Sequence, residues 1–185
     1  MSATDKRRSV RVELGARSYD IVIGQGLLSA AGREIAAVLP GVRAAIITDD
    51  NVAAVHGATL AASLAAAGVD ATTITIAPGE ASKNFETLEK VVDGVLSARL
   101  ERGDVVIALG GGVVGELTGF VSGIVRRGMK FVQMPTSLLA QVDSSVGGKT
   151  GINTAHGKNL VGVFQQPSLV LADTGVLDTL PEREF

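Results

Sequence analysis

The chain has 185 residues, of which 46% are hydrophobic and 19% are charged, and its formal net charge is −2 at pH 7. Length and composition predict a single globular domain, and they argue against a disordered chain and against a basic nucleic-acid-binding surface. Because the chain has no cysteine, disulfides, iron–sulfur ligation, zinc fingers and thiol nucleophiles are excluded.

The predicted elements alternate between strands and helices after an N-terminal β-hairpin. Residues 9–14 alternate polar and apolar side chains, and they pair with 19–23 across a turn at Gly15. Helices are predicted where apolar residues recur at helical spacing. In chain order the remaining elements are a strand at 43–48, a helix at 52–67, a strand at 71–76, a helix at 84–98, a strand at 105–109, a helix at 113–125 and a strand at 130–134.

This alternation predicts βαβ units and a parallel sheet. The almost fully apolar run Val105–Leu109 fits a central strand that is covered on both faces. We therefore expect a Rossmann-like, doubly wound α/β fold with a mostly parallel sheet and an N-terminal β-hairpin. After Thr136 the periodicity weakens, and residues 143–158, which are rich in Gly, Ser, Thr, Asn and Lys, show no predicted helix or strand.

No segment is predicted to cross a membrane or to act as an export signal. Residues 52–69 carry no formal charge, but alanines, glycines and hydroxyl residues make a bilayer span improbable there. The first eight residues lack the apolar block of a signal peptide. We therefore expect a cytoplasmic protein.

A glycine-rich segment, Gly110–Gly115, fits the pattern G-x-G-x-x-G between a predicted strand and a predicted helix. Such glycines let backbone N–H groups approach a pyrophosphate at a helix N-terminus. The usual fingerprint follows the first strand and precedes an acidic residue by about 20 positions, and this segment does neither. An ordinary Rossmann dehydrogenase is therefore disfavoured, and two interpretations stay open: nucleotide binding by a variant site, or a tight turn for helix–sheet packing.

Two other predicted strands also end in polar residues, at Thr48–Asn51 and at Pro78–Lys83. Asp49, Asn51 and Glu80 could accept hydrogen bonds from a ribose or an adenine amino group, and Lys83 could lie near a phosphate. The same residue types cap helices, which is the alternative interpretation. Because ligands of open α/β sheets bind beyond the carboxyl ends of the strands, three polar ends on one rim favour a nucleotide site.

The segment 143–159 concentrates polar side chains at Asp143, Ser144, Ser145, Lys149, Asn153, Lys158 and Asn159. Lys149 and Lys158 suit anionic oxygens, and Asp143 could orient or deprotonate a hydroxyl. The alternative is a solvated loop. Gly147–Thr150 looks like the end of a P-loop, but Asp143 stands where that motif needs glycine.

The two histidines do not form a metal-binding pattern. With no cysteine and no close His pair, we expect no metal site within this chain. His56, on the alanine-rich helix, is predicted to be a satisfied core or surface histidine.

Five segments together closely resemble the 3-dehydroquinate synthase family: Pro78–Lys83, Gly110–Gly115, Met134–Asn153, Gly157–Leu160 and Leu180–Glu184. The resemblance spans essentially the whole chain, and the block Pro135–Asn159 is its most specific part. Glu116 stands where the family more often has Asp, and Ser137 where a second Thr is common. Both substitutions keep the hydrogen-bonding type.

The resemblance implies an enzyme of the shikimate pathway that converts 3-deoxy-D-arabino-heptulosonate 7-phosphate, a small sugar phosphate, to 3-dehydroquinate and phosphate. The family uses NAD and a zinc or cobalt ion. A ring hydroxyl is transiently oxidised, phosphate is eliminated, the ketone is reduced, and the ring opens and recloses by an aldol step. The implied protein is a homodimer at full length, with no nucleic-acid or membrane partner.

The resemblance also implies the site residues. Those expected to face the substrate or act in catalysis are Asp143, Lys149, Asn159 and Arg127, the last across a dimer interface. Those expected to contact NAD are Asp49, Asn51, Pro78, Gly79, Glu80, Ala81, Ser82, Lys83, Gly112, Val113, Val114, Gly115, Glu116, Thr136, Ser137, Lys149, Lys158, Val176, Leu177, Asp178 and Thr179.

In the family the metal is held by a glutamate and two histidines that follow the segment matching the end of this chain. We therefore expect residues 1–185 to form the NAD-binding α/β domain, with the metal-binding helical C-terminal domain absent and no turnover by this chain alone. Three alternatives stay open: another sugar-phosphate cyclase, a metal-dependent alcohol dehydrogenase of the glycerol dehydrogenase type, and a non-catalytic nucleotide-binding module.

Overall fold

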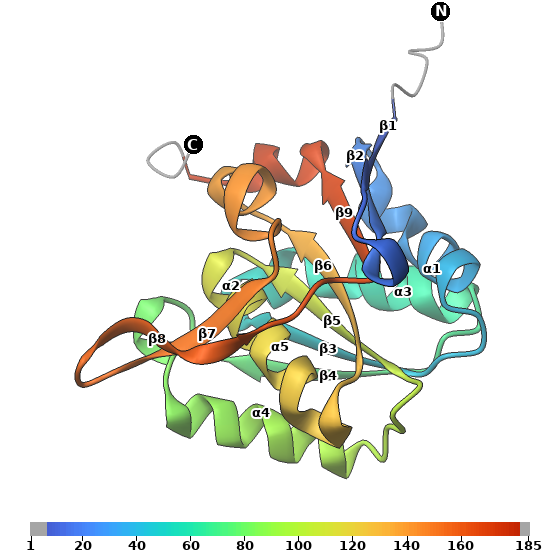
Figure 1. The fold of residues 1–185 in the computed structure, drawn as a ribbon. Coiled ribbons are helices and arrows are strands. Elements are labelled where there is room, and N and C mark those ends of the chain that lie inside the picture. The colour runs from blue at the N-terminus through green and yellow to red at the C-terminus, as the bar shows by residue number, and fades with distance from the viewer. Residues whose placement is uncertain (1–6, 182–185) are drawn as a thin grey trace, which may run out of the picture.

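The computed structural model describes residues 7–181, which form a seven-stranded sheet in the order β1-β2-β9-β6-β5-β3-β4 (Figure 1). Strand β1 pairs with β2 antiparallel, and the pairs from β2 to β4 across the sheet are parallel. The strands are β1 (Arg8–Val12), β2 (Tyr19–Gly24), β3 (Ala44–Asp49), β4 (Ala71–Ile76), β5 (Val105–Gly110), β6 (Lys130–Pro135) and β9 (Leu169–Asp173). The predicted mostly parallel sheet with an N-terminal hairpin is confirmed.

Helices cover both faces of this sheet, as a doubly wound fold requires. The two faces can be followed along β3, where Ala44 and Ile46 pack into one apolar cluster and Ala45 and Ile47 into the other. Helices α1 (Leu27–Val38) and α3 (Ala58–Ala66) cover the first face, and α4 (Phe85–Ser97) and α5 (Gly112–Ile124) cover the second. Both faces of the central strands are therefore buried, which explains their continuous apolar runs.

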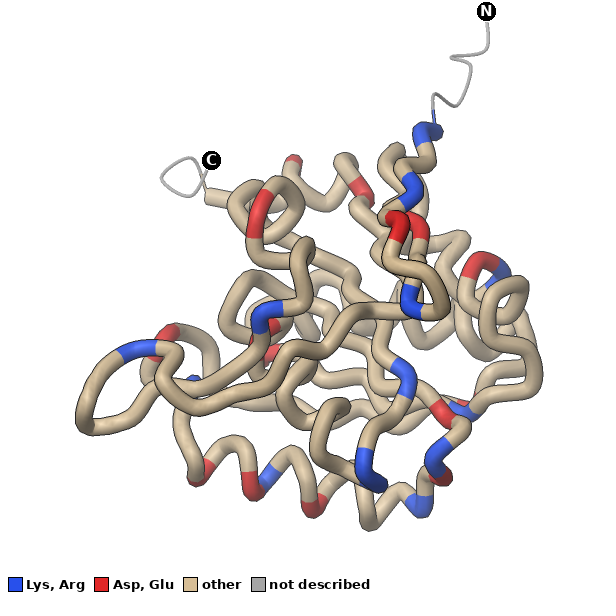
Figure 2. The backbone as a smooth tube through the Cα atoms, in the orientation of Figure 1, with Lys and Arg blue, Asp and Glu red and all other residues tan. Residues whose placement is uncertain are grey.

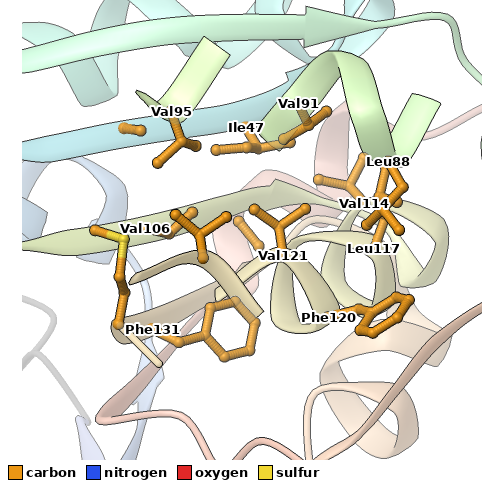
Figure 3. Close-up of a cluster of buried hydrophobic side chains, with 14 of the residues drawn as sticks. Ile47, Leu88, Val91, Val95, Val106, Val114, Leu117, Phe120, Val121 and Phe131 are labelled. Carbon is orange, nitrogen blue, oxygen red and sulfur yellow. The ribbon is translucent and has the colours of Figure 1, made fainter. Parts of the chain in front are cut away.

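The larger cluster lies between the sheet and the pair α4 and α5 (Figure 3). Val91 and Val95 extend from α4, and Leu117 and Val121 extend from α5, all with at most 1% of their surface exposed. Phe131 of β6 is also fully buried in this cluster. This packing fixes α5, and with it the glycine-rich turn at its N-terminus.

The alternative interpretation of residues 143–159 as a solvated loop is wrong, because most of the segment forms strands that the sequence did not predict. A short helical turn (Ala140–Ser144) is followed by a second, two-stranded sheet of β7 (Lys149–Thr154) and β8 (Gly157–Phe164), here called the β7–β8 hairpin. Gly151 and Gly162 lie opposite each other, and a Cβ on Gly151 would come within 2.6 Å of the Val161 carbonyl oxygen. Close passage of the two backbones requires glycine there, and these glycines conceal the strand pattern in the sequence.

The elements that the sequence did not predict also include α1, β9 and the 3-10 helix η6 (Thr174–Thr179). The predicted helix at 52–67 is present but interrupted, since α2 (Asp50–Val52), a π-helical turn (Ala53–Gly57) and α3 follow one another. The π-helical turn contains His56, whose position is described below.

Lys and Arg are interspersed with Asp and Glu over the outer elements (Figure 2). Within residues 7–181, no helix has both the length and the apolar character needed to cross a bilayer. The N-terminal tail up to Lys6 and the last part of the Leu180–Glu184 segment, from Glu182 on, lie outside the described residues.

Candidate functional site

The polar ends of β3, β4 and β5 lie on one rim of the sheet, as predicted, because the three strands are parallel neighbours. The rim encloses a pocket of about 550 Å³, here called the rim pocket. Its lining includes the predicted residues Asp49, Asn51, Pro78, Gly79, Thr136, Ser137 and Thr179, together with Gly111 and His56. The structure thus brings together residues that are up to 130 positions apart by number, from Asp49 to Thr179.

Helix α5 begins at this pocket, with Gly111 as its N-cap residue and no side-chain hydrogen bond to its first turn. A Cβ on Gly111 would lie 3.4 Å from the Ser137 hydroxyl, and one on Gly112 would lie 3.2 Å from the Ser144 hydroxyl. Gly79 lines the same pocket with φ of 97° and open space around its Cα. The backbone N–H groups at this end of α5 are therefore accessible to an anion.

Other glycines of the same motif serve packing. A Cβ on Gly110 would lie 2.6 Å from Val114 Cβ, and one on Gly115 would lie 2.6 Å from the Gln133 side-chain oxygen. Val114 itself is buried in the core. Within the motif, Gly111 therefore lies at the pocket, whereas Gly110 and Gly115 lie between the helix and the sheet.

The Asp49 side chain caps α2, since its Oδ1 accepts the Val52 backbone N–H at 3.0 Å. One carboxylate oxygen of Asp49 therefore serves a structural role while the residue still lines the pocket. Asn51 is exposed at the pocket, where its amide can face a ligand.

His56 is 8% exposed and joins two walls of the rim pocket. Its Nε2 lies 2.9 Å from the Thr179 hydroxyl, and that hydroxyl donates to the Val176 carbonyl at 2.7 Å. Because the hydroxyl proton is already used, Nε2 carries the hydrogen of this contact and donates it to Thr179. Burial lowers the pKa of His56 below its ordinary value, and Asp173 opposes that effect in part. The predicted satisfied histidine is confirmed, and it also lies at the pocket.

A second group of predicted residues meets beside the β7–β8 hairpin. Lys83 is 3% exposed, and its ammonium group donates to Glu116 of α5 and to the Asn159 side-chain oxygen. Lys83 therefore forms a buried ion pair with Glu116 and does not line the rim pocket. Glu116, Asn159 and Lys149 line a neighbouring cavity of about 360 Å³ between α5 and the hairpin.

Glu80 and Lys158 lie at the outer side of this group, with Lys158 Nζ 4.0 Å from Glu80 Oε1. Both residues are largely exposed, so their ion pair is weak. Together with Ala81 and Lys83 they line a more open pocket of about 790 Å³ beside the hairpin turn.

Several predicted site residues lie apart from these pockets. Asp143 is exposed on the turn before the hairpin, Asp178 is exposed on η6, and Ser82 donates its hydroxyl to the Ala77 carbonyl at 2.6 Å. Val176 and Leu177 are buried, so their side chains serve the core. Arg127 is exposed after α5, near the start of β6. It therefore lies at the amino ends of the parallel strands, whereas the rim pocket lies at their carboxyl ends.

Two residues at the site were not predicted in these positions. His56 was assigned no role at a pocket, because its partner Thr179 is 123 positions away. Gln141 was overlooked, although its side-chain NH₂ donates to the Pro135 and Asp173 carbonyls at 3.2 and 2.8 Å and joins the ends of β6 and β9. Neither contact has a local sequence signal.

Within residues 7–181, no group of three or more His, Cys, Asp or Glu side chains could hold a metal ion.

A family model and curated relatives both match the 3-dehydroquinate synthase family. The family model described as 3-dehydroquinate synthase N-terminal matches residues 73–185. The chain is 72% identical over 177 residues to the 3-dehydroquinate synthases of Brucella ovis and Brucella abortus, covering 96% of this chain and 47% of each relative. The chain thus spans about half the length of these curated relatives.

Two solved structures share the fold over 96% of this chain and 48% of their own. One is 2-deoxy-scyllo-inosose synthase in complex with carbaglucose-6-phosphate, NAD+ and Co2+, with a TM-score of 0.88 and 25% identity. The other is the 2-epi-5-epi-valiolone synthase from Streptomyces hygroscopicus with bound NAD+ and Zn2+, with a TM-score of 0.82 and 35% identity.

Proposed function

Because this chain belongs to the 3-dehydroquinate synthase family, we propose that it forms the nucleotide-binding half of an enzyme that converts 3-deoxy-D-arabino-heptulosonate 7-phosphate to 3-dehydroquinate and phosphate. The observation that carries the proposal is the rim pocket, where three parallel strand ends and the uncapped N-terminus of α5 meet. Relatives that are 72% identical bear the name of this enzyme, and two structural neighbours of lower identity hold NAD+.

The rim pocket suits NAD on the chemistry of its lining. The open glycine backbone at the start of α5 offers N–H donors to a pyrophosphate, and Asp49 and Asn51 offer acceptors to a ribose or an adenine. NAD, when bound, supplies the transient oxidation that acidifies the neighbouring C–H bond of the substrate. The residues of this chain bind and orient that cofactor, and the adjacent cavity with Lys149 and Asn159 offers a cation and an amide to an anionic sugar phosphate.

The divalent metal is proposed to be held outside the residues described here, which contain no suitable group of ligands. Residues 1–185 would then be the NAD-binding domain, and turnover would need the remainder of the full-length protein. We further propose a cytoplasmic homodimer, in which the exposed Arg127 reaches the substrate site of the second copy.

A calorimetric titration of NAD into this chain tests the proposal. Gly111→Asp places a carboxylate in the rim pocket, where the backbone φ of −74° accepts any residue and the nearest side-chain atom is 3.4 Å from the new Cβ. We expect NAD affinity to fall at least about tenfold, because the negative charge opposes a pyrophosphate. Gly103→Asp, at a glycine with open space around it, is the matched control. A folded chain that does not bind NAD, or an unchanged affinity in Gly111→Asp, would remove the rim pocket as the cofactor site.

A further inference from the structure

Asn153 belongs to the polar segment 143–159 but was given no role by the sequence or by the family resemblance. It makes three hydrogen bonds that join separate parts of the site. Its backbone N–H donates to the Lys83 carbonyl at 2.8 Å. Its side-chain NH₂ donates to Glu80 Oε1 at 2.7 Å, and its side-chain oxygen accepts the Asn159 backbone N–H at 3.0 Å. One residue of β7 thus contacts the segment before α4 and the far strand of its own hairpin.

These partners determine the orientation of the Asn153 side chain. A carboxylate can only accept, and a backbone N–H can only donate, so the amide nitrogen must face Glu80 and the oxygen must face Asn159. Neither serine nor alanine can replace both bonds at once. Aspartate could still accept from Asn159, but it would set a carboxylate oxygen against the carboxylate of Glu80.

Asn159 has a backbone φ of +57°, in the left-handed region, which asparagine adopts more readily than most non-glycine residues but which still benefits from a hydrogen bond that holds it. In that conformation its backbone N–H donates to the Asn153 side-chain oxygen while its own side-chain oxygen accepts from the Lys83 ammonium group. The bond from Asn153 therefore helps to hold the left-handed conformation of the residue that lines the cavity beside Lys149.

Lys83 depends on the same arrangement. Its ammonium group is buried between Glu116 and Asn159, and its backbone carbonyl is held by Asn153. A buried ammonium group that loses one of its acceptors is strongly destabilised and moves toward water. Asn153 therefore acts on Lys83 through Asn159: it holds Asn159 in place, and Asn159 accepts the hydrogen bond from the Lys83 ammonium group.

We propose that Asn153 is a positioning residue, which holds Asn159 in its left-handed conformation and keeps the Lys83 ammonium group buried against Glu116. It acts through these two residues and does not itself line the cavity that contains Lys149. Only the expected effect of Asn153 on turnover rests on the proposed function. The claim that Asn153 holds Asn159 and Lys83 in place can be tested in this chain alone.

The first test is the reactivity of the Lys83 amine in this chain, measured residue by residue with an amine-modifying reagent and mass spectrometry. We expect Asn153→Ala to raise the modification rate of Lys83 by about tenfold, because the bond that holds Asn159 in place is lost. The exposed Lys158 and Lys130 should keep their rates. Thr154→Ala is the matched control, since it removes a bond of the same hairpin turn, from the His156 N–H, without touching Asn153.

The second test is a charge-pair rescue. Asn153→Asp should expose Lys83 through its repulsion with Glu80, and Glu80→Gln in the same chain should restore a donor–acceptor pair and the protection of Lys83. If Asn153→Ala does not fold, the comparison of Asn153→Asp with the double variant Asn153→Asp, Glu80→Gln tests the proposal instead. Unchanged Lys83 reactivity in Asn153→Ala, or in Asn153→Asp with no rescue by Glu80→Gln, would overturn the proposal.

The catalytic consequence is measured separately in the full-length enzyme. We expect Asn153→Ala to lower kcat more than it raises the KM for NAD, since the rim pocket does not include Asn153. Failure of the proposed function would appear as absent turnover in the unmodified enzyme. Failure of the positioning claim would appear as full turnover in Asn153→Ala, so the two outcomes are distinguishable.

Discussion

The carboxylate of Asp173 accepts the backbone N–H of Leu28 at 2.8 Å, across 145 positions of sequence. The same carboxylate accepts the N–H groups of Gly26 and Gly175, at 3.1 and 2.9 Å. Helix α1 begins after Gly26, which has no side chain to cap it, so Asp173 at the end of β9 supplies the cap from another element. The N-terminal and C-terminal parts of the described chain are joined at this point.

We expect Asp173→Ala to lower the free energy of unfolding by about 2–3 kcal/mol, because a buried, charged acceptor of three N–H groups is removed. Asp173→Asn keeps one acceptor oxygen and should cost less. Urea denaturation followed by circular dichroism measures both. Asp178→Ala, at an exposed aspartate five positions on, is the control and should stay within about 0.5 kcal/mol of the unmodified chain. Equal stabilities of Asp173→Ala and Asp178→Ala would contradict the capping role.

The pH dependence of stability should contain a contribution from His56. Burial lowers its pKa in the folded chain below the ordinary value of 6.5, so the unfolded chain binds the proton more readily. The contribution of neutral His56 to stability is therefore complete above pH 6.5 and is lost as the pH falls through the lowered pKa. His56→Gln should flatten the unfolding free energy in this acidic range, while His156→Gln, at an exposed histidine, should leave the slope unchanged. If the unfolding free energy varies with pH equally in the unmodified chain, His56→Gln and His156→Gln, then His56 is not the source of that pH dependence.

The sheet and its rim were predictable because their signals are local. The run Val105–Leu109 is apolar on both faces, and the polar residues directly after β3 and β4 follow from the strand ends themselves. Parallel neighbours then place those ends on one edge without further information. The rim pocket could therefore be predicted from the polar residues at the ends of these parallel strands.

Helix α1 and the β7–β8 hairpin were not predictable in the same way. The cap of α1 lies on Asp173, and the segment itself begins with a glycine in the left-handed region. In the hairpin, glycine replaces β-branched residues where the strands pass closely. The contacts of Lys83 with Glu116 and Asn159 join three elements, and no local spacing indicates them.

The packing of α5 against the hairpin should depend on Gly119. A Cβ there would collide with the Thr150 methyl group and lie 3.0 Å from Phe131, which is fully buried. We expect Gly119→Ala to destabilise the chain by about 1–3 kcal/mol, despite the higher helix propensity of alanine. Gly57→Ala is the matched control, since its Cβ would make only an ordinary contact, 3.8 Å from Ala53. Thermal or urea unfolding measures the stability of both variants. If Gly119→Ala is as stable as the unmodified chain, the β7–β8 hairpin moves to accommodate the new methyl group without loss of unfolding free energy.

Arg127 should have no part in cofactor binding by a single chain. It is exposed near the amino end of β6, while the rim pocket lies beyond the carboxyl ends of the strands. We expect Arg127→Ala to leave both NAD affinity and unfolding free energy within about 0.5 kcal/mol of the unmodified chain. In the full-length enzyme the same substitution should lower turnover, because the arginine is proposed to reach the substrate of a second copy. Mixing full-length Arg127→Ala with full-length Lys149→Ala provides the decisive measurement. If the two residues act at one shared site across the interface, mixed dimers regain activity at one of their two sites, whereas residues acting within the same chain give no recovery.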